Sequence, residues 1–209
     1  MESHMVYLIS ALTGYLFGCF QTSYLLVKFL KKTDIRKHGT SNAGASNAAI
    51  VFGWKFGLVI ALVDICKTIL AVTLISFIFP EDHLLKYIAG LSSILGHIFP
   101  FYMQFKGGKG FASYAGLVLS MNWRLGIVFI FFCIIITVVT NYISIAAMIS
   151  TGVYPLYNIF IREDTTIILL LIMMYFVIIY RHRENISRLK TGQEKGLRDL
   201  LKRNKPIQP

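Results

Sequence analysis

Charged residues are scarce in this chain of 209 residues, because Asp, Glu, Lys and Arg together make up only 15% of it. Soluble globular domains contain nearer a quarter. Hydrophobic residues make up 56%, and the mean hydropathy is +0.64. This balance excludes a soluble protein and predicts an all-α integral membrane protein. The length leaves no room for a second sizeable domain, so we expect residues 1–209 to form a single membrane domain.

Cysteine is also scarce, with Cys19, Cys66 and Cys133 lying far apart in apolar segments. No pair has the spacing of a metal site, so we interpret them as free thiols that pack like small hydrophobic groups. No serine or cysteine nucleophile motif is visible either. An enzyme with this sequence would act by positioning and electrostatics and would need no metal or cofactor.

A net charge of +11 would suit a nucleic-acid partner, but the hydropathy argues against one. The basic residues gather in the connections between apolar segments, as they do in cytoplasmic loops, where they also attract anionic lipids. The sequence therefore predicts membrane lipid, and not nucleic acid, as the surrounding partner. The first apolar segment is too long for a signal peptide and lacks its cleavage site, so we expect a retained helix.

Seven apolar segments have the character of membrane helices, which need roughly 20 residues to span the bilayer. Their expected ranges are 6–30, 53–79, 84–103, 111–122, 125–140, 143–161 and 165–180. The fourth has only 12 residues, or about 18 Å of helix, which is short of a hydrocarbon core of about 30 Å. Its shortness indicates that the preceding loop enters the membrane and lines a cavity.

Basic residues in the connections predict the orientation. With seven crossings, sixteen of them fall on one side and three on the other. The larger set is Lys28, Lys31, Lys32, Arg36, Lys37, Lys106, Lys109, Arg181, Arg183, Arg188, Lys190, Lys195, Arg198, Lys202, Arg203 and Lys205, and the smaller set is Lys86, Arg124 and Arg162. We therefore expect the N-terminus outside and the C-terminal tail in the cytoplasm.

The run Phe105–Gly110 interleaves two lysines with three glycines at the edge of an apolar segment. Glycine allows close backbone approach to a ligand, and lysine is a point charge for phosphate. No Ser or Thr follows at the spacing of a Walker A loop. An anion site is one interpretation and a basic anchor in a flexible loop is the other. His97, in the preceding Gly96–Pro100 motif, fits an interior histidine as well as a catalyst.

Three further polar clusters fall on the same predicted side. Small and hydrogen-bonding residues fill 34–47, where backbone N–H groups and Arg36 could hold phosphate, or where a solvated loop could simply cap a helix. Asn141–Ser144 resembles an interfacial tyrosine with a helix cap. Arg181–Ile186, followed by Gly192–Glu194, suits either a site or a basic helix on the membrane surface.

Those clusters, in that order, resemble the bacterial acyl-phosphate-dependent glycerol-3-phosphate acyltransferases of the PlsY type. The matching stretches are 34–47, Gly96–Pro100, Phe105–Gly110 and Arg181–Ile186, spread over nearly the whole chain. The resemblance implies seven helices in the bacterial plasma membrane and an active site at the cytoplasmic face. It implies acyl transfer from acyl phosphate to the 1-hydroxyl of glycerol 3-phosphate, which gives lysophosphatidic acid, the first step of phospholipid synthesis. It implies no metal, no cofactor and a monomer.

The resemblance also assigns roles to residues of this sequence. Those implied in catalysis are Lys109, Asn185, His182 and Ser144. Those implied in binding substrate phosphate are Arg36, Thr40, Ser41, Asn42, Ser46, Asn47, Lys106, Gly107, Gly108, Gly110, His97, Asn141 and Glu194. Of these we expect Lys109 to be the least replaceable cation.

This chain departs from the family pattern at several positions. Ile50 and Asn141 stand where the family has arginine, Gln21 stands where it has proline, and Ser46 and Ser113 replace threonine. Losing cations from a pocket that handles phosphates weakens it unless other basic groups compensate. Two alternatives to the acyltransferase therefore stay open: a weak or inactive paralogue that binds lipid phosphate or protein partners, and a small anion transporter.

Overall fold

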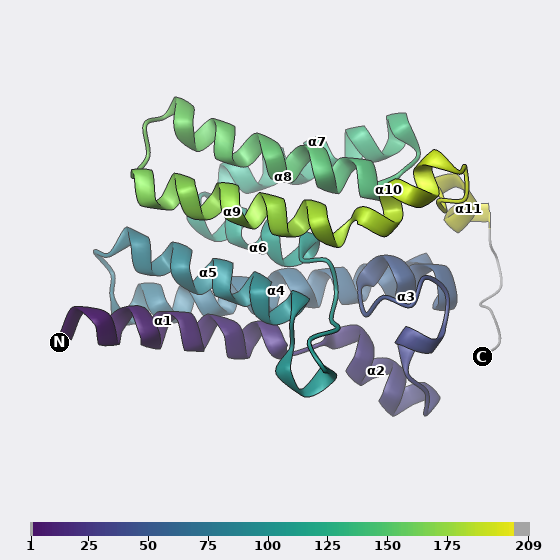
Figure 1. Ribbon diagram of the computed structural model, residues 1–209, viewed down its shortest axis with the longest axis horizontal. Coiled ribbons are helices and arrows are strands. Elements are labelled where there is room, and N and C mark those ends of the chain that lie inside the picture. The colour runs from purple at the N-terminus through teal and green to yellow at the C-terminus, as the bar shows by residue number, and fades with distance from the viewer. Residues whose placement is uncertain (1, 203–209) are drawn as a thin grey trace.

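The computed structural model describes residues 2–202, and every regular element within that range is helical, as the sequence predicts. The long helices lie side by side along one direction (Figure 1). Helix α1 begins at one end of the bundle, whereas α10 and α11 lie at the other. Met1 and the basic Arg203 and Lys205 lie outside the described residues. Chain segments from both halves of the sequence thus meet at the α10 end.

The expected first helix is interrupted near its middle, giving α1, Glu2–Cys19, and α2, Thr22–Lys31. Gln21 has φ −91° and ψ 87°, which are not helical values. Its side-chain amide donates to the carbonyl of His97 over 2.8 Å, and the carbonyl of Phe20 accepts from Lys67 over 2.8 Å. The side chain of Lys67 therefore satisfies a backbone carbonyl that the break leaves free, and the side chain of Gln21 joins the break to the end of α5.

The remaining helices follow the expected order closely. Their bounds are η1 Ile35–Lys37, α3 Ala45–Phe52, α4 Trp54–Ile78, α5 His83–Ile98, η2 Phe101–Met103, α6 Phe111–Met121, α7 Trp123–Thr140, α8 Ile143–Phe160, α9 Thr165–Arg181, α10 Arg183–Lys190 and α11 Leu197–Lys202. Helices α3 and α11 were not expected, since each is short and polar segments flank it. Asp82, Asn122 and Asp164 accept backbone N–H groups at the starts of α5, α7 and α9, which fixes where these helices begin.

Five helical stretches of the described chain are long and apolar enough to cross a membrane. They are His4–Lys31, Trp54–Ile78, His83–Met103, Trp123–Thr140 and Ile143–Phe160. Helices α9 and α10 together make a sixth, bent by 49° at their junction. Helix α6 has only 11 residues, so the expectation of a short helix in this region is confirmed. The chain is a multi-pass membrane protein.

Helices α1 and α5 pack unusually closely because glycines line their contact. A Cβ at Gly14 would overlap the carbonyl of Ala89, and a Cβ at Gly18 would overlap that of Ser93. Small residues four apart let helix backbones approach in membranes, where dispersion and hydrogen bonds replace the hydrophobic effect. Ser10 adds such a hydrogen bond to the carbonyl of Leu85, over 2.6 Å.

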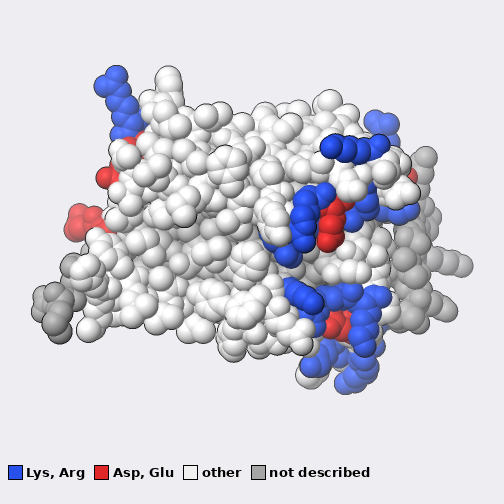
Figure 2. Space-filling view, viewed as in Figure 1, with Lys and Arg blue, Asp and Glu red and all other residues white. Residues whose placement is uncertain are grey.

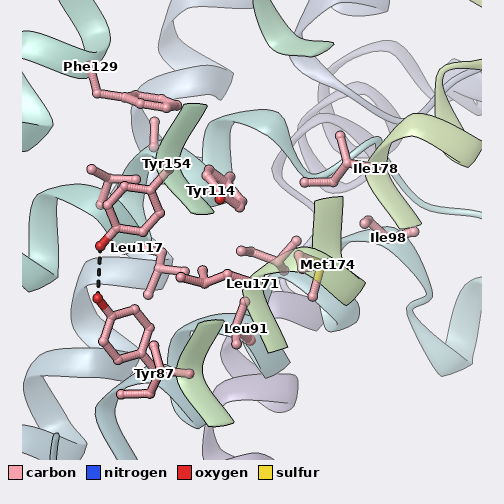
Figure 3. Packing of buried hydrophobic residues seen from close by; sticks show 14 of the residues in the cluster. Tyr87, Leu91, Ile98, Tyr114, Leu117, Phe129, Tyr154, Leu171, Met174 and Ile178 are labelled. Atoms are coloured by element: carbon pink, nitrogen blue, oxygen red, sulfur yellow. Dashed lines mark hydrogen bonds between the residues drawn. The ribbon is translucent and has the colours of Figure 1, made fainter. Parts of the chain in front are cut away.

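The largest buried cluster lies between α5, α6, α7, α8 and α9, where aromatic and branched side chains interlock (Figure 3). Tyr114 is fully buried at its centre, and its hydroxyl donates to the carbonyl of Thr151. The hydroxyls of Tyr87 and Tyr154 hydrogen-bond each other over 3.0 Å. These hydrogen bonds satisfy hydroxyl groups that would otherwise lack partners in the apolar interior. The bond made by Tyr114 also holds the short α6 deep in the bundle.

Charge divides the surface into zones along the bundle. Figure 2 shows Lys and Arg gathered at the end where α2, α10 and α11 lie, a broad uncharged band over the long helices, and a smaller charged group at the opposite end. Large apolar side chains such as Phe77, Phe131 and Phe160 are exposed on the outside. An apolar belt between two charged rims is the surface expected of a protein embedded in lipid.

Candidate functional site

A cavity of about 540 Å³ lies at the basic end of the bundle. One part of its lining is polar and comes from segments far apart in the sequence. These polar residues are Thr40, Asn42, Ser46, Asn47, Asp64, His97, Lys109, Thr137, Ser144, His182, Asn185, Arg188, Glu194 and Lys195. The other part is apolar and comes from the facing sides of α4, α6 and α7, including Leu58, Ile65, Ala115 and Ile130. A single cavity thus offers hydrogen-bonding groups and an apolar channel.

Lys109 lies where these two parts of the cavity meet, because the next turns of α6 supply Phe111 and Ala115 to the apolar lining. Its ammonium group donates to Oδ1 of Asn185 on α10. Burial and, to a smaller extent, the nearby charge of Arg188 together lower the pKa of Lys109 to about 8. A half-buried cation that makes no ion pair with any described carboxylate is a strong candidate for an anion site.

The loop before Lys109 is held from beneath by backbone hydrogen bonds. The N–H of Gly107 donates to Ile98, and the N–H of Gly108 donates to the carbonyl of His97, each over 3.0 Å. Arg181 donates to the carbonyls of both glycines from the other side, over 3.4 and 3.3 Å. A Cβ at Gly108 would overlap the His97 ring. The glycines therefore serve to seat the loop on α5.

A chain of hydrogen bonds extends from Lys109 into the tail. The Asn185 amide group donates to Glu194, whose other carboxylate oxygen accepts from Nε of Arg188 over 2.7 Å. Burial alone would raise the pKa of Glu194, but the hydrogen bonds from Asn185 and Arg188 lower it overall. Nη2 of Arg188 is buried and has no hydrogen-bond partner among the described residues. A second cation thus belongs to the cavity lining and retains an unused donor.

His182 joins α9 to α10 and is buried beside this chain. Its Nδ1 lies 2.8 Å from the carbonyl of Ile178, so Nδ1 bears the hydrogen and Nε2 is left as an acceptor. The neutral ring in this tautomer can accept a hydrogen bond from a substrate hydroxyl through Nε2.

The 34–47 loop approaches the cavity with only part of its polar groups. Asn47 is buried and uses its side chain to order the loop, because it donates to the carbonyls of residues 35, 38 and 42 and accepts from the N–H of Thr40. Arg36 forms a bidentate pair with Asp34 and donates to the carbonyl of Met103 over 2.9 Å. Thr40, Asn42 and Ser46 remain as the groups in the lining.

Several expected site residues lie outside the cavity lining. They are Arg36, Ser41, Lys106, Gly107, Gly108 and Asn141. Lys106 is exposed. Asn141 ends α7 with φ +71°, and its side-chain oxygen and its carbonyl accept from Arg198 and Leu197 at the start of α11. Asn141 therefore anchors the tail. Every other residue expected in the site is part of the lining, Gly110 included.

Sequence reasoning assigned no role to three charged residues at or beside the site, namely Asp64, Lys67 and Arg188. Asp64 and Arg188 line the cavity, and Lys67 lies 2.9 Å from Asp64. The sequence contained a signal for Asp64 and Lys67 of α4, because opposite charges three residues apart within an apolar helix mark functional positions. Among the described residues, no three His, Cys, Asp or Glu side chains are grouped as a metal site requires.

Comparison with known proteins gives consistent matches over nearly the whole chain. The family described as "Glycerol-3-phosphate acyltransferase" matches residues 8–192. Similar proteins include a glycerol-3-phosphate acyltransferase of Pelagibacter ubique, 39% identical over 190 residues covering 91% of this chain and 97% of that one. Another is glycerol-3-phosphate acyltransferase 1 of Oceanobacillus iheyensis, 35% identical over 209 residues covering 94% and 98%.

Solved structures give the same match at the level of the fold. The crystal structure of PlsY (YgiH), an integral membrane glycerol 3-phosphate acyltransferase, in its glycerol 3-phosphate form has a TM-score of 0.84 and 30% identity. The alignment covers 91% of this chain and 95% of that one. The lysophosphatidic acid form has a TM-score of 0.81 and 29% identity, with coverage of 94% and 99%.

Proposed function

We propose that this chain, which belongs to the glycerol-3-phosphate acyltransferase family, transfers a fatty acyl group from acyl phosphate to the 1-hydroxyl of glycerol 3-phosphate. The product is lysophosphatidic acid, the first intermediate of phospholipid synthesis. The observation that carries the proposal is the half-buried ammonium of Lys109, which lies where the polar and apolar linings meet. The similar PlsY structures, in glycerol 3-phosphate and lysophosphatidic acid forms, support the same substrate and product.

The two substrates explain why one cavity has two kinds of lining. Both contain phosphate, and the donor also contains an acyl chain that is costly to expose to water. The channel formed by Leu58, Ile65, Ala115 and Ile130 accommodates the acyl chain. The polar end places hydrogen-bond donors beside the carbonyl carbon at the head of that chain. Donor and acceptor can therefore meet without the acyl chain leaving the lipid phase.

Phosphate is held in this proposal by Lys109 and Arg188. Lys109 supplies a compact ammonium group, and Nη2 of Arg188 supplies the donor that has no partner within the described protein. Charge-assisted hydrogen bonds of this kind contribute about 1.5–3 kcal/mol each. Ile50 lines the same cavity at the position where the family resemblance implies arginine. Arg188 supplies the compensating positive charge that the sequence left unidentified.

Acyl transfer forms a bond between the 1-hydroxyl oxygen and the acyl carbonyl carbon, and it breaks the bond from that carbon to the phosphate oxygen. The hydroxyl proton ends on the released phosphate, so no protein base has to keep it. His182 orients the hydroxyl through Nε2, while Lys109 and Asn185 stabilise negative charge that develops on the leaving phosphate. Catalysis then depends on preorganised donors and not on a covalent enzyme intermediate.

The proposal includes an orientation in the bacterial plasma membrane. In this proposal α6 counts as a crossing beside the five long spans and the α9–α10 pair, and the seven crossings put the N-terminus outside and the cavity at the cytoplasmic face. The basic rim in Figure 2 lies at the cavity end, which supports this orientation. A monomer as the working unit is part of the same proposal.

Purified protein incubated with labelled glycerol 3-phosphate tests the proposal directly. Palmitoyl phosphate should yield 1-acyl product, whereas palmitoyl-CoA and palmitoyl-acyl carrier protein should not, and a metal chelator should leave the rate unchanged. Product from the thioester donors alone would contradict the choice of donor. Binding of glycerol 3-phosphate without product from any donor would favour the alternative of an inactive paralogue.

A further inference from the structure

A buried polar network lies beside the cavity, between the break after α1, the middle of α4 and the end of α5. Asp64, Lys67 and His97 are each at most 4% exposed. Nζ of Lys67 lies 2.9 Å from Oδ1 of Asp64, 2.9 Å from Nδ1 of His97 and 2.8 Å from the carbonyl of Phe20. The hydroxyl of Thr22 donates to the same oxygen of Asp64 over 2.9 Å.

The three acceptors around Lys67 match the three protons of an ammonium group, which has no acceptor of its own. Nδ1 of His97 must therefore accept, and the hydrogen of the neutral ring must lie on Nε2. The carbonyl of His97 is occupied separately, by Gly108 and Gln21. Lys67 thus selects one tautomer of His97, while the backbone contacts fix the position of the residue.

Nε2 of His97 points at the lysine–glycine loop and lines the cavity. A Cβ at Gly108 would overlap this atom, so the ring occupies the space directly beneath the loop. Nε2 makes no hydrogen bond to any described residue, and His97 belongs to the cavity lining. A donor N–H with no protein acceptor, next to the loop that presents Lys109, is available to an oxygen atom of the substrate.

We propose that Lys67, paired with Asp64, is a positioning residue for the acyl transfer: it keeps His97 in the tautomer whose Nε2–H donates to a substrate phosphate or acyl oxygen. Asp64 in turn keeps the ammonium charged and in place. This inference rests on the proposed function for the identity of the substrate, but the tautomer itself is a property of the protein alone.

The energetic setting supports a functional role for the pair. Two opposite charges within an apolar helix incur a desolvation penalty that their attraction often fails to offset, and well-packed apolar residues are commonly as stable or more so. Ionisable residues inside membrane segments are accordingly rare and mark sites of function. The neighbouring hydrogen bond between Thr68 and Ser93 also joins α4 to α5, yet it touches neither His97 nor the loop and provides a matched control.

Kinetics of a neutralised pair test the role. Asp64→Asn combined with Lys67→Met removes both charges together and leaves an acceptor for Thr22. We expect kcat/KM to fall at least tenfold, and Thr68→Val to stay within twofold of the wild type. Asp64→Asn combined with Lys67→Gln restores an amide donor toward Nδ1 and should recover part of the loss. A neutral pair that retains activity within twofold would overturn the proposal.

A double-mutant cycle separates positioning from a general structural role. If Lys67 acts through His97, adding the Asp64→Asn and Lys67→Met pair to His97→Leu should lower kcat/KM by less than a further twofold. If the losses of kcat/KM from the pair and from His97→Leu instead multiply, in proteins of equal thermal stability, the pair acts independently of His97 and the inference is overturned.

The tautomer can be observed without any turnover. Long-range ¹H–¹⁵N correlation of ring-labelled protein in detergent, with His97→Gln for assignment, should show an Nε2–H ring in the wild type. The neutral pair should shift this resonance toward a mixture of tautomers. An Nδ1–H ring in the wild type would overturn the proposal even if the enzyme is active. Absence of acyltransferase activity alongside the Nε2–H signal would instead contradict the proposed function.

Discussion

At the scale of single residues, the setting of Lys109 has a consequence for pH. Burial lowers its pKa to about 8, so the ammonium loses its proton about two pH units earlier than an ordinary lysine. Binding of a phosphate requires the charged form. We therefore expect kcat/KM for glycerol 3-phosphate to fall above pH 8, by about tenfold per pH unit.

The pH profile needs a control because other groups titrate in alkali. Lys109→Arg keeps a charge that does not titrate in this range, so its residual kcat/KM should stay level between pH 8 and 10. A wild-type profile that is flat up to pH 10 would contradict a buried, substrate-binding Lys109.

Arg188 provides the second prediction at this scale. Arg188→Met removes the donor at Nη2 and should raise KM for glycerol 3-phosphate at least tenfold, since a charge-assisted hydrogen bond contributes about 1.5–3 kcal/mol. Arg183→Met is the matched control, because Arg183 is exposed and stacks on the ring of Tyr180. Equal KM values for the two variants would remove Arg188 from the phosphate site.

The structure brings some of the expected site residues into one cavity and leaves others outside it. Lys109, Asn185 and His182, which the family resemblance singled out, all line one cavity. The sequence could not show that Arg36 is paired with Asp34 and faces Met103. Nor could it show that Asn141 anchors the tail, because that contact joins residues 57 positions apart. Which polar side chains face a shared cavity depends on packing and not on composition.

At the scale of elements, apolar length predicted most helices to within two or three residues. The break at Phe20 and Gln21 was missed because its backbone partners, Lys67 and His97, come from other helices. The short α6 was expected. Its buried side chains, Tyr114 among them, pack into the largest buried cluster, which explains how a helix of 11 residues is held in the bundle. Local hydropathy therefore finds elements, whereas tertiary hydrogen bonds decide where they bend.

Helix α11 gives the prediction at this scale. Leu197 and Leu200 line the cavity, and the contacts of Asn141 hold the start of the helix. Asn141→Gly keeps the left-handed backbone but removes the side-chain hydrogen bond to Arg198. We expect at least threefold faster limited proteolysis within residues 193–202. Thr140→Val, on the same helix end, should have no such effect. Equal cleavage in both variants would show that the side chain does not hold the tail.

At the scale of the whole molecule, charge and helix length together define the proposed orientation. The cavity lies at the basic end and α1 begins at the opposite end (Figures 1 and 2). Composition sufficed to predict a multi-pass membrane protein. The count of seven crossings stays a prediction, because α6 is too short to decide it by length.

Cysteine labelling tests the orientation. In a background with the three native cysteines replaced, Glu81→Cys and Lys190→Cys place single thiols at exposed positions on opposite ends. A membrane-impermeant maleimide added to intact cells should label the first variant, and the second only after permeabilisation. Labelling of Lys190→Cys from outside would invert the topology and move the cavity to the outer face.

The central claim is that the half-buried ammonium of Lys109, at the head of an apolar channel, recognises phosphate in acyl transfer. Measuring lysophosphatidic acid formation by Lys109→Met and Lys106→Met tests this most directly, because both lysines lie in one loop and only Lys109 lines the cavity. Losing one preorganised donor costs about 2.7–4 kcal/mol. We expect kcat/KM with acyl phosphate to fall at least a hundredfold for Lys109→Met and less than threefold for Lys106→Met. Near-normal product formation by folded Lys109→Met would contradict the account.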